Sequence, residues 1–437
     1  MKDENILYWI WLADRCGAAS DEFGRLAEKY DDPFEIYRME EEEIERIDGI
    51  SPKLKLRLFD KTLDSAYDIL KYCKQKNIEI ISYRDKRYPS RLRGIQDPPV
   101  LLYVLGDLPN MDDRLCIGMV GTRKMSEYGR DEAYKISYEL AAANAVIVSG
   151  MALGIDAVSA CGALAAGGKT VAVLGCGISV VYPKEHAALM REIGKKGAVI
   201  TEYPPFERPH GYNFPKRNRI ISGLCQGVII VEGAAGSGAL ITAKRTIDQG
   251  RELFALPGKI SENNSEVPNE LIKSGALVAL SADDIIGHYD FLYRDCINYR
   301  GLRKAKENKV SVYKAMEKYG VADICDSTRS HRVEKIQTKS DVCVDVPVGS
   351  NNYNEKTQSD SIPMERKAPR SDRSAELLSA LDDVSRKVFD GLPMDKAVTP
   401  DGIQIEGIGI GEIITALTML EISGLVESLP GGMYIRK

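Results

Sequence analysis

Apolar residues follow helical spacing at the start of the chain and strand-like spacing after it. Positions such as Leu7, Ile10 and Trp11 recur every three to four residues, which predicts a small all-helical unit over residues 1–76. From Ile78 the segment IEIISY is followed by proline turns and a second apolar run, VLLYVLG. These two segments predict strands that lead into the main part of the chain.

Within the helical unit, residues 47–53 read IDGISPK and have the glycine and proline of a tight turn between two helices. The turn is similar to that of helix-hairpin-helix modules, whose amide groups hold DNA phosphate. Any pair of helices needs such a turn, so a structural role is the simpler interpretation.

Short apolar runs recur between residues 115 and 280, and most are separated by segments of helical length. The runs are CIGMV, AVIVS, TVAVLG, AVIT, GVIIV, LFAL and LVAL. Runs that are apolar on both faces and alternate with helices are typical of a parallel sheet covered on both sides. The pattern therefore predicts an α/β fold over residues 77–290, with an extended Rossmann-like, doubly wound and mostly parallel sheet.

The last part of the chain is expected to contain three segments. Residues 291–326 have helical spacing and several cations, which a solvent-exposed helix face explains more simply than a track for DNA. Residues 327–374 lose all apolar periodicity, which predicts a flexible linker. Residues 375–437 follow a pattern of three helices and a hairpin, which predicts a C-terminal winged-helix domain.

The third helix expected in the winged helix, within residues 411–423, contains neither lysine nor arginine. Winged helices that bind duplex DNA often do so through this helix, and DNA phosphates attract cations. A protein-docking or regulatory role is therefore at least as good an interpretation as duplex binding.

Composition narrows the class of protein. The 437 residues carry a net charge of -5, so any nucleic-acid binding must depend on a local basic patch. Nine cysteines without a C-x-x-C pair suggest neither a disulfide framework nor a metal site, and are expected to be buried in a reducing cytoplasm. The first apolar run is too short for a membrane span and is interrupted by Asp14 and Arg15, so we expect no membrane segment or signal peptide.

The stretch from Phe214 to Thr242 is the strongest candidate for a binding site. It places three cations, Lys216, Arg217 and Arg219, ahead of an apolar strand and a glycine-serine loop. A strand, a turn of small residues and a helix start offer free backbone N–H groups to an anion, and arginines add further donors. The expected ligand is a phosphate group.

Glycines follow several of the predicted strands. They are Gly121, Gly150, Gly154, Gly175, Gly177, Gly233, Gly236, Gly238 and Gly258, and they coincide with the polar residues Arg123, Ser149, Asp156, Arg217, Arg219 and Ser237. In parallel α/β sheets the loops after the strands meet at one edge and form the ligand crevice. The sequence therefore predicts one site assembled from several loops.

Familiar nucleotide motifs do not fit. Gly168, Lys169 and Thr170 resemble the end of a Walker A loop, but Ala163 stands where that motif requires glycine, and the segment precedes a strand. No G-x-G-x-x-G follows the first strand of the core, which argues against NAD. We therefore expect no cofactor.

Several segments match one family in combination. They are GTRKMSEYG from Gly121, VSGMALGIDAVSACGAL from Val148, TVAVLGCGISVVYPKEH from Thr170, TEYPP from Thr201, FPKRNRIISGL from Phe214, VEGAAGSGALITA from Val231 and LFALPG from Leu253. With the helical start and the terminal winged helix, they resemble the DNA-processing protein A family, also called Smf, over most of the chain. The resemblance implies a non-enzymatic protein that protects incoming single-stranded DNA in natural transformation or recombination. It further implies loading of the RecA recombinase and a homodimer that places two binding sites along one strand.

The expected DNA phosphate-binding residues come from two sources, which are this resemblance and the cations of the 214–242 stretch. They are Arg123, Ser149, Gly150, Gly154, Asp156, Lys216, Arg217, Asn218, Arg219, Ser237, Gly238 and Thr242. Tyr212 or Phe214 is expected to stack on bases, although Phe214 fits the core equally well. The chain departs from the family's glycine-rich pattern at Ser265 to Asn269, so that loop is left out of the site.

An enzyme remains the alternative. The lysine-decarboxylase-like phosphoribohydrolases share a Rossmann-like core and an arginine-plus-glycine phosphate site. In such an enzyme Glu232 or Asp156 would perform acid–base work on an N-glycosidic bond. Ordering of the loops through N–H contacts is the simpler role for both carboxylates.

Overall fold

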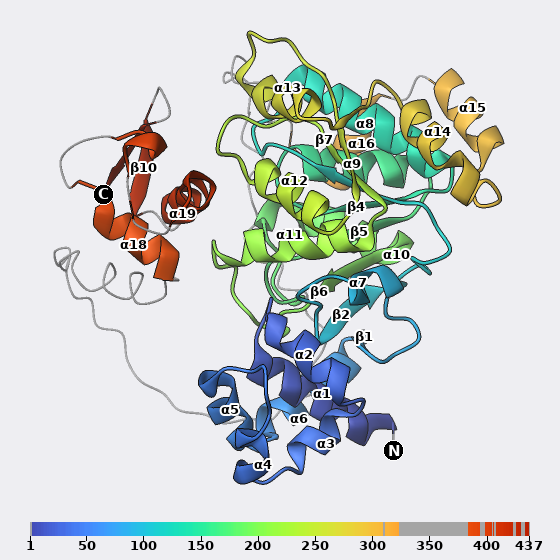
Figure 1. Ribbon diagram of the computed structural model, residues 1–437. Helices are drawn as coiled ribbons and strands as arrows, with labels where there is room; N and C mark the ends of the chain where they lie inside the picture. Colours follow the sequence, from blue (N-terminus) through green and yellow to red (C-terminus); the bar gives the residue numbers. More distant parts are fainter. Residues whose placement is uncertain are drawn as a thin grey trace, which may run out of the picture.

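The computed structural model describes residues 2–308, 311–322, 383–393, 398–403, 405, 408–422, 425–429 and 433–436. Within these residues, a nine-stranded sheet with helices on both faces forms the main body, and a group of helices precedes it (Figure 1). The linker predicted over residues 327–374 lies outside the described residues.

Helices occupy the start of the chain, where helical spacing predicts them. They are α1 (Lys2–Cys16), α2 (Asp21–Lys29), α3 (Pro33–Tyr37), α4 (Glu41–Glu45), α5 (Pro52–Phe59) and α6 (Asp64–Gln75). The turn before α5 is a helix cap: Ser51 Oγ accepts a hydrogen bond from Leu54 N at 3.2 Å, and Pro52 takes the first helical position. Trp11 anchors α1, because its buried indole donates to the Asp60 carbonyl at 2.8 Å. That these helices fold as a separate domain stays a prediction.

The sheet is mixed and mostly parallel, as predicted. Its strands are β1 (Ile78–Ser82), β2 (Leu101–Gly106), β3 (Cys116–Val120), β4 (Val146–Ser149), β5 (Thr170–Val173), β6 (Ala198–Thr201), β7 (Gly227–Ile230), β8 (Glu252–Ala255) and β9 (Leu277–Val278). They lie in the order β1-β2-β6-β5-β4-β3-β7-β8-β9. All neighbours from β6 to β9 in this order are parallel, whereas β2 pairs antiparallel with both β1 and β6.

The central strands β3 to β7 bury both of their faces. In β3, Ile117 and Met119 pack into one apolar cluster, while Cys116 and Val120 pack into the other. The first cluster includes α8 (Glu127–Ala142), α9 (Ile155–Ala165) and α10 (Ala187–Lys196), and the second includes α7 (Ser90–Arg93), α11 (Asn213–Leu224), α12 (Gly238–Asp248) and α13 (Glu266–Lys273). Helices on both faces explain why the strands read as continuous apolar runs. The cysteines among the described residues are free, and all but Cys296 are buried.

The order in which strands are added to the sheet reverses between the parallel neighbours β3 and β7. From β3 the chain adds β4, β5 and β6 on one side, and from β7 it adds β8 and β9 on the other. The carboxyl ends of the two strands are joined by hydrogen bonds from Val231 N to Val120 O at 3.0 Å and from Thr122 N to Glu232 O at 2.8 Å. In open α/β sheets ligands bind at such a switch point, in the crevice outside the carboxyl ends.

Further helices follow the sheet. They are α14 (Ala282–Tyr293), α15 (Tyr299–Glu307) and α16 (Val312–Tyr319), with short 3₁₀ turns at Lys184–His186 and Asn263–Ser265 earlier in the chain. Near the C-terminus lie α18 (Asp383–Gly391), α19 (Ile410–Ile422) and the antiparallel pair β10 (Val426–Leu429) and β11 (Met433–Arg436). Between α18 and α19, where the second of the three expected helices would lie, the described residues form a 3₁₀ turn, Pro400–Gly402. None of the helices in the described part of the chain is both long and apolar enough to cross a membrane.

Candidate nucleic-acid interface

Arg217 of α11 lies beneath the glycine loops at the carboxyl edge of the sheet. Its side chain is buried, and Nη1 donates to the Gly150 carbonyl at 2.9 Å and to the Val173 carbonyl. Burial lowers the pKa of the guanidinium, while nearby Asp156 opposes that shift. Arg217 therefore fixes α11 to the ends of β4 and β5, and its charge acts from below the surface.

The loop after β4 is built around Asp156. Its Oδ2 accepts a hydrogen bond from Gly150 N at 2.9 Å, and Ser149 Oγ donates to the Asp156 carbonyl at 3.2 Å. A Cβ at position 150 would lie 2.6 Å from both Arg217 Cζ and Asp156 Oδ2, so only glycine permits this close approach. Burial raises the pKa of Asp156, and the neighbouring Arg217 lowers it. The predicted Ser149, Gly150, Asp156 and Arg217 thus form one network.

Gly154 brings this loop against the turn that carries Arg123. Its φ is +77°, and a Cβ there would lie 2.7 Å from the Arg123 carbonyl. Arg123 itself is exposed, and its Cζ lies 5.6 Å from the centre of the Phe214 ring. The close packing of the two loops therefore positions an exposed cation over an aromatic ring.

Phe214 is the centre of a stack of rings and cations. The Arg217 guanidinium lies 6.0 Å from its ring centre, and the Tyr182 ring lies 5.2 Å away. Gly175 makes room for the ring, since a Cβ there would lie 2.8 Å from Phe214 Cδ1. Phe214 is half-buried and Tyr182 is 36% exposed, so both rings remain open to a stacking partner. Sequence reasoning missed Tyr182, although it is an aromatic residue in a loop after a core strand.

A second cation and ring lie at the start of α11. Lys216 Nζ lies 5.6 Å over the Tyr212 ring, and the His210 ring stacks on Tyr212 at 5.3 Å with an interplanar angle of 7°. All three side chains are exposed. Together with Arg123, Phe214 and Tyr182, they form what we call the α11 platform.

The start of α12 provides backbone donors near α11. Ser237 is the N-cap residue and Gly238 is exposed, with open space where a Cβ would stand. Asn218 Nδ2 donates to Thr242 Oγ1 at 2.9 Å, which ties α11 to α12. The first N–H groups of a helix attract anions, whereas the buried Thr242 has a positioning role.

The position of Arg219 differs from the sequence-based expectation that this residue binds a DNA phosphate. Its side chain is fully buried, with Nη2 2.6 Å from Glu202 Oε2 and Nε 3.1 Å from Asp97 Oδ2. Residues two apart on a helix point about 200° apart, so Arg219 faces away from Arg217. Its charge is neutralised inside the protein, and it does not reach a phosphate on the surface.

Glu232 holds Ser126, the N-cap residue of α8, which is the helix that follows the Arg123 turn. The carboxylate is 3% exposed and accepts hydrogen bonds from Ser126 N at 2.9 Å and from Ser126 Oγ. Asn264 Nδ2 donates to it at 3.4 Å. Glu232 and Asp156 both order loops through N–H groups, which is the simpler of the two roles considered for them.

The segment from Ser265 to Asn269, which departs from the glycine-rich pattern of the family that the sequence resembles, lies beside this cap. Residues 265–269 open α13, and the Asn269 side chain bonds both Gly258 N at 3.1 Å and Gly258 O at 3.0 Å. Ser265 also lines a groove of about 1140 Å³ that includes Ser126 and Glu232. Residues 265–269 therefore shape the edge of the crevice and are not part of the α11 platform.

Known proteins share this core. The family model described as DNA recombination-mediator protein A matches residues 79–290. The DNA processing protein DprA of Bacillus subtilis is 39% identical over 217 residues, which cover 50% of this chain and 73% of that protein. The DNA processing protein DprA of Streptococcus pneumoniae is 41% identical over 210 residues, which cover 48% of this chain and 74% of that protein.

A solved structure agrees with the sequence comparisons. The X-ray structure of DNA processing protein A from Streptococcus pneumoniae superposes with a TM-score of 0.56 at 35% identity, covering 64% of this chain and 97% of the solved one. The residues that the family model matches contain β2 to β9 and the loops that carry the α11 platform. The chain therefore belongs to the DNA recombination-mediator protein A family.

Proposed function

We propose that the chain is a DNA processing protein that binds single-stranded DNA along the α11 platform. The observation that carries this proposal is the stack of Arg123, Phe214 and Tyr182 at the carboxyl edge of the sheet. Membership of a family whose relatives are named DNA processing proteins supports it. The role falls in natural transformation or in recombination.

Open aromatic faces favour a single strand over a duplex. Bases of a single strand are free to stack on Phe214, Tyr182 or Tyr212, whereas duplex bases are already stacked on each other. Arg123, Lys216 and the amide groups at the start of α12 hold the backbone phosphates. Binding is therefore tolerant of sequence and sensitive to salt.

Titration with a fluorescent oligo-thymidine tests this proposal. The double change Arg123→Ala and Lys216→Ala removes the two exposed cations of the platform and should weaken binding about tenfold or more. Lys195→Ala removes an exposed cation near the end of α10 and serves as the matched control. It lies just before the amino end of β6, at the edge of the sheet opposite the platform. Equal affinity of the double variant and the parent would contradict the assignment of the platform.

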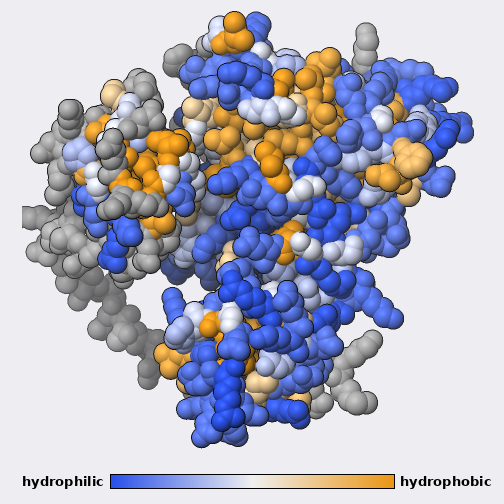
Figure 2. All heavy atoms as spheres, viewed as in Figure 1, coloured by the Kyte–Doolittle hydropathy of each residue, from blue (hydrophilic) through white to orange (hydrophobic). Residues whose placement is uncertain are grey.

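The homodimer stays part of the proposal, and we place its interface on the β9 side of the core. β9 is an edge strand, and Val278 and Leu280 beside it are 43% and 63% exposed. Exposed edges with apolar side chains favour pairing with another chain. In the view of Figure 2, apolar residues gather on the core beside α12 and α14, whereas the N-terminal helices are mostly hydrophilic. Sedimentation of Leu280→Arg tests this placement, because a monomer is expected for that variant and a dimer for the parent.

The C-terminal segment is proposed to form a winged helix that docks a protein. α18, α19 and the β10–β11 pair share one apolar cluster, and α19 contains no lysine or arginine. Loading of the RecA recombinase onto the bound strand is the activity proposed for the dimer. Assembly of RecA filaments on oligo-thymidine, with the full chain and with a chain ending at residue 322, separates recombinase loading from DNA binding.

Catalysis forms no part of the proposed function. Asp156 and Glu232, the two acids that an N-glycosidase would use, both accept hydrogen bonds from backbone N–H groups at 2.9 Å. Incubation with nucleoside monophosphates tests the enzyme alternative directly. Release of free base that is lost in Glu232→Gln would overturn the non-enzymatic proposal.

A further inference from the structure

His186 is a buried histidine just after the loop that carries Tyr182 of the α11 platform. The residue is 1% exposed and ends the 3₁₀ turn Lys184–His186. Its backbone N–H donates to the Pro183 carbonyl at 3.1 Å, so this turn begins directly after Tyr182. A shift of His186 is therefore passed to the Tyr182 ring over a single turn of the chain.

The imidazole of His186 is bonded to a different loop, the one after β4. Its Nδ1 lies 3.0 Å from the Met151 carbonyl oxygen. Because a carbonyl oxygen only accepts, Nδ1 carries the proton and donates it. Burial lowers the pKa of the imidazole below its ordinary value of about 6.5. The ring is therefore neutral at pH 7.5, and its one N–H group is used to join the two loops.

Met151 has a backbone conformation that needs such support. Its φ is +55°, in the left-handed region that a residue with a Cβ adopts at a cost. Conformations of this kind persist where the surroundings hold them, and they are frequent at functional sites. The Met151 side chain is fully buried in the first apolar cluster. With its carbonyl bonded to His186, the residue is held by both its side chain and its backbone.

The residue before Met151 is held in the same manner. Gly150 N donates to Asp156 Oδ2 at 2.9 Å, and the Gly150 carbonyl accepts from Arg217 Nη1 at 2.9 Å. Three backbone polar groups of these two neighbouring residues are thus bonded to three different side chains. His186 provides one of these bonds, and it comes from the segment that carries Tyr182.

These contacts form a closed circuit through two rings of the platform. The Tyr182 ring lies 5.2 Å from the Phe214 ring, and the Phe214 ring lies 6.0 Å from the Arg217 guanidinium. Arg217 is bonded to Gly150, and the next residue of that loop is bonded to His186. The circuit closes at Tyr182, which precedes the turn that ends at His186. The separation of the two rings is therefore fixed from below as well as by their own contact.

We propose that His186 is a positioning residue of the DNA site and sets the spacing of the Tyr182 and Phe214 rings from beneath the surface. This inference rests on the proposed function, because the spacing of the rings matters only where bases stack on them. His186 does not touch the strand. Its loss should therefore weaken stacking and leave the phosphate contacts unchanged.

Titration of three variants with fluorescent oligo-thymidine tests this inference. His186→Leu removes the donor at similar volume and should weaken binding about tenfold, which corresponds to about one stacked base. His186→Asn should bind as tightly as the parent, because its amide nitrogen is as many bonds from the backbone as Nδ1 and donates to Met151 in its place. His288→Leu is the matched control, since that histidine is exposed and lies beside Glu252 at the amino end of β8.

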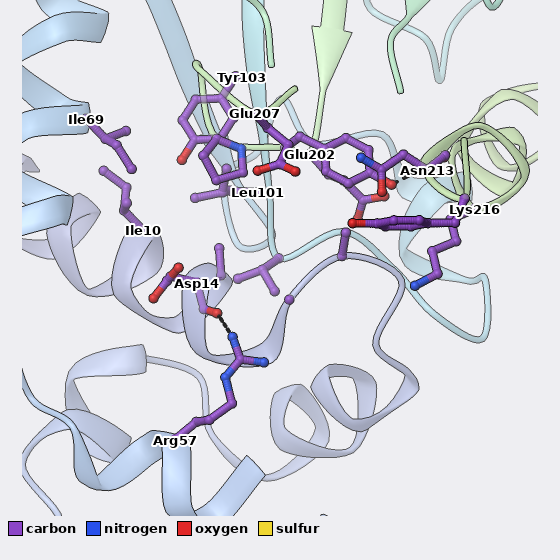
Figure 3. Close-up of a pocket in the computed structure, with 17 residues that line it drawn as sticks. Ile10, Asp14, Arg57, Ile69, Leu101, Tyr103, Glu202, Glu207, Asn213 and Lys216 are labelled. Carbon is purple, nitrogen blue, oxygen red and sulfur yellow. Dashed lines mark hydrogen bonds between the residues drawn. The ribbon is translucent and has the colours of Figure 1, made fainter. Parts of the chain in front are cut away.

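A double-mutant cycle separates positioning of the rings from a general loss of structure. Once Tyr182→Ala has removed one ring, His186→Leu should cause little further loss of affinity. Lys216 contacts the Tyr212 ring and borders the cavity between α11 and the N-terminal helices (Figure 3). The losses from Lys216→Ala and His186→Leu should therefore multiply. The salt dependence of binding by His186→Leu should equal that of the parent, because no phosphate contact is lost.

Several results would overturn the inference and leave the proposed function standing. They are parent-like affinity of His186→Leu, an equal loss in His186→Asn, losses that multiply in the cycle with Tyr182→Ala but not in that with Lys216→Ala, and a weaker salt dependence of His186→Leu. Failure of the parent to bind oligo-thymidine would overturn both. If His186→Leu does not fold, His186→Gln takes its place, because its amide nitrogen lies one bond further from the backbone than Nδ1 and does not superpose on it.

Discussion

Arg217 and Arg219 lie two residues apart on α11 and have opposite surroundings. The Arg217 guanidinium donates to backbone carbonyls at the ends of β4 and β5, beneath the glycine loops. Arg219 lies on the other side of the helix, where Asp97 and Glu202 neutralise its charge. One side of α11 therefore supports the proposed DNA site, and the other side fixes the helix to the core.

The comparison teaches that the role of a cation depends on its surroundings. Lys216, Arg217 and Arg219 belong to one basic cluster in the sequence, yet only Lys216 is exposed. Arg217 supports the Phe214 ring from below, and Arg219 is part of a buried ion-pair group. Changes on the two sides of α11 should therefore separate stability from DNA binding.

Replacing Arg219 with leucine is expected to have the largest effect. The change leaves Asp97 and Glu202 buried without their cation and should lower the free energy of unfolding by about 3–5 kcal/mol. Urea denaturation followed by circular dichroism measures the loss, and Lys195→Ala should change it by less than about 0.5 kcal/mol. A loss below about 1 kcal/mol for the leucine variant would mean that the two carboxylates do not depend on Arg219.

Gly150→Ala is expected to act on both stability and binding. The new Cβ would lie 2.6 Å from Arg217 Cζ, so the guanidinium must move, which should cost about 1–3 kcal/mol of unfolding free energy. Affinity for oligo-thymidine should fall as well, because Arg217 supports Phe214. Gly287→Ala in α14, where a Cβ meets nothing within 4 Å, is the control and should be neutral or slightly stabilising. Parent-like stability and affinity of Gly150→Ala would show that the loop does not require this approach.

Phe214→Ala should weaken binding of oligo-thymidine about tenfold, since one stacked base contributes about 1–3 kcal/mol. Fluorescence anisotropy measures the affinity. Phe206→Ala is the matched control, because that residue is 60% exposed and its ring packs on Tyr72 and not in the stack. The centres of the Phe206 and Tyr72 rings lie 4.4 Å apart. If Phe206→Ala lost as much affinity as Phe214→Ala, the stack would have no special role.

The smallest effect expected is a pH dependence from His186. Burial lowers the pKa of its imidazole, and the ring Nδ1 lies 3.0 Å from the Met151 carbonyl. Because the folded pKa is depressed, the unfolded chain takes up the proton first, so stability is present above the ordinary pKa of about 6.5 and is lost as the pH falls through the folded value.

Unfolding in urea at pH 7.5 and pH 5.5 tests this effect. The parent should lose more stability between the two values than His186→Gln, which has no titrating ring. The exposed His288→Gln should behave like the parent. Equal losses for the parent and His186→Gln would rule out a contribution from His186.

The sheet and its loops were predictable because strands buried on both faces read as continuous apolar runs. Runs such as GVIIV and AVIVS locate β7 and β4 directly, and the glycines after them mark the carboxyl edge. The strands β1 and β2 were also recognised as strands. Their antiparallel pairing with each other, and that of β2 with β6, depend on contacts that no local pattern encodes.

The site was predictable as a set of loops but not as a set of side-chain roles. Arg219 matched the basic motif, yet its partners Asp97 and Glu202 come from distant segments. Tyr182 joins Phe214 only through the fold.

The salt dependence of oligo-thymidine affinity tests the central claim most directly. With about three or four phosphate contacts per site, the slope of log affinity against log salt should be about -2 to -3 for the parent. The double variant Arg123→Ala, Lys216→Ala should make that slope less steep by about 1. An unchanged slope in the double variant would contradict the claim that the exposed side of α11 holds the DNA backbone.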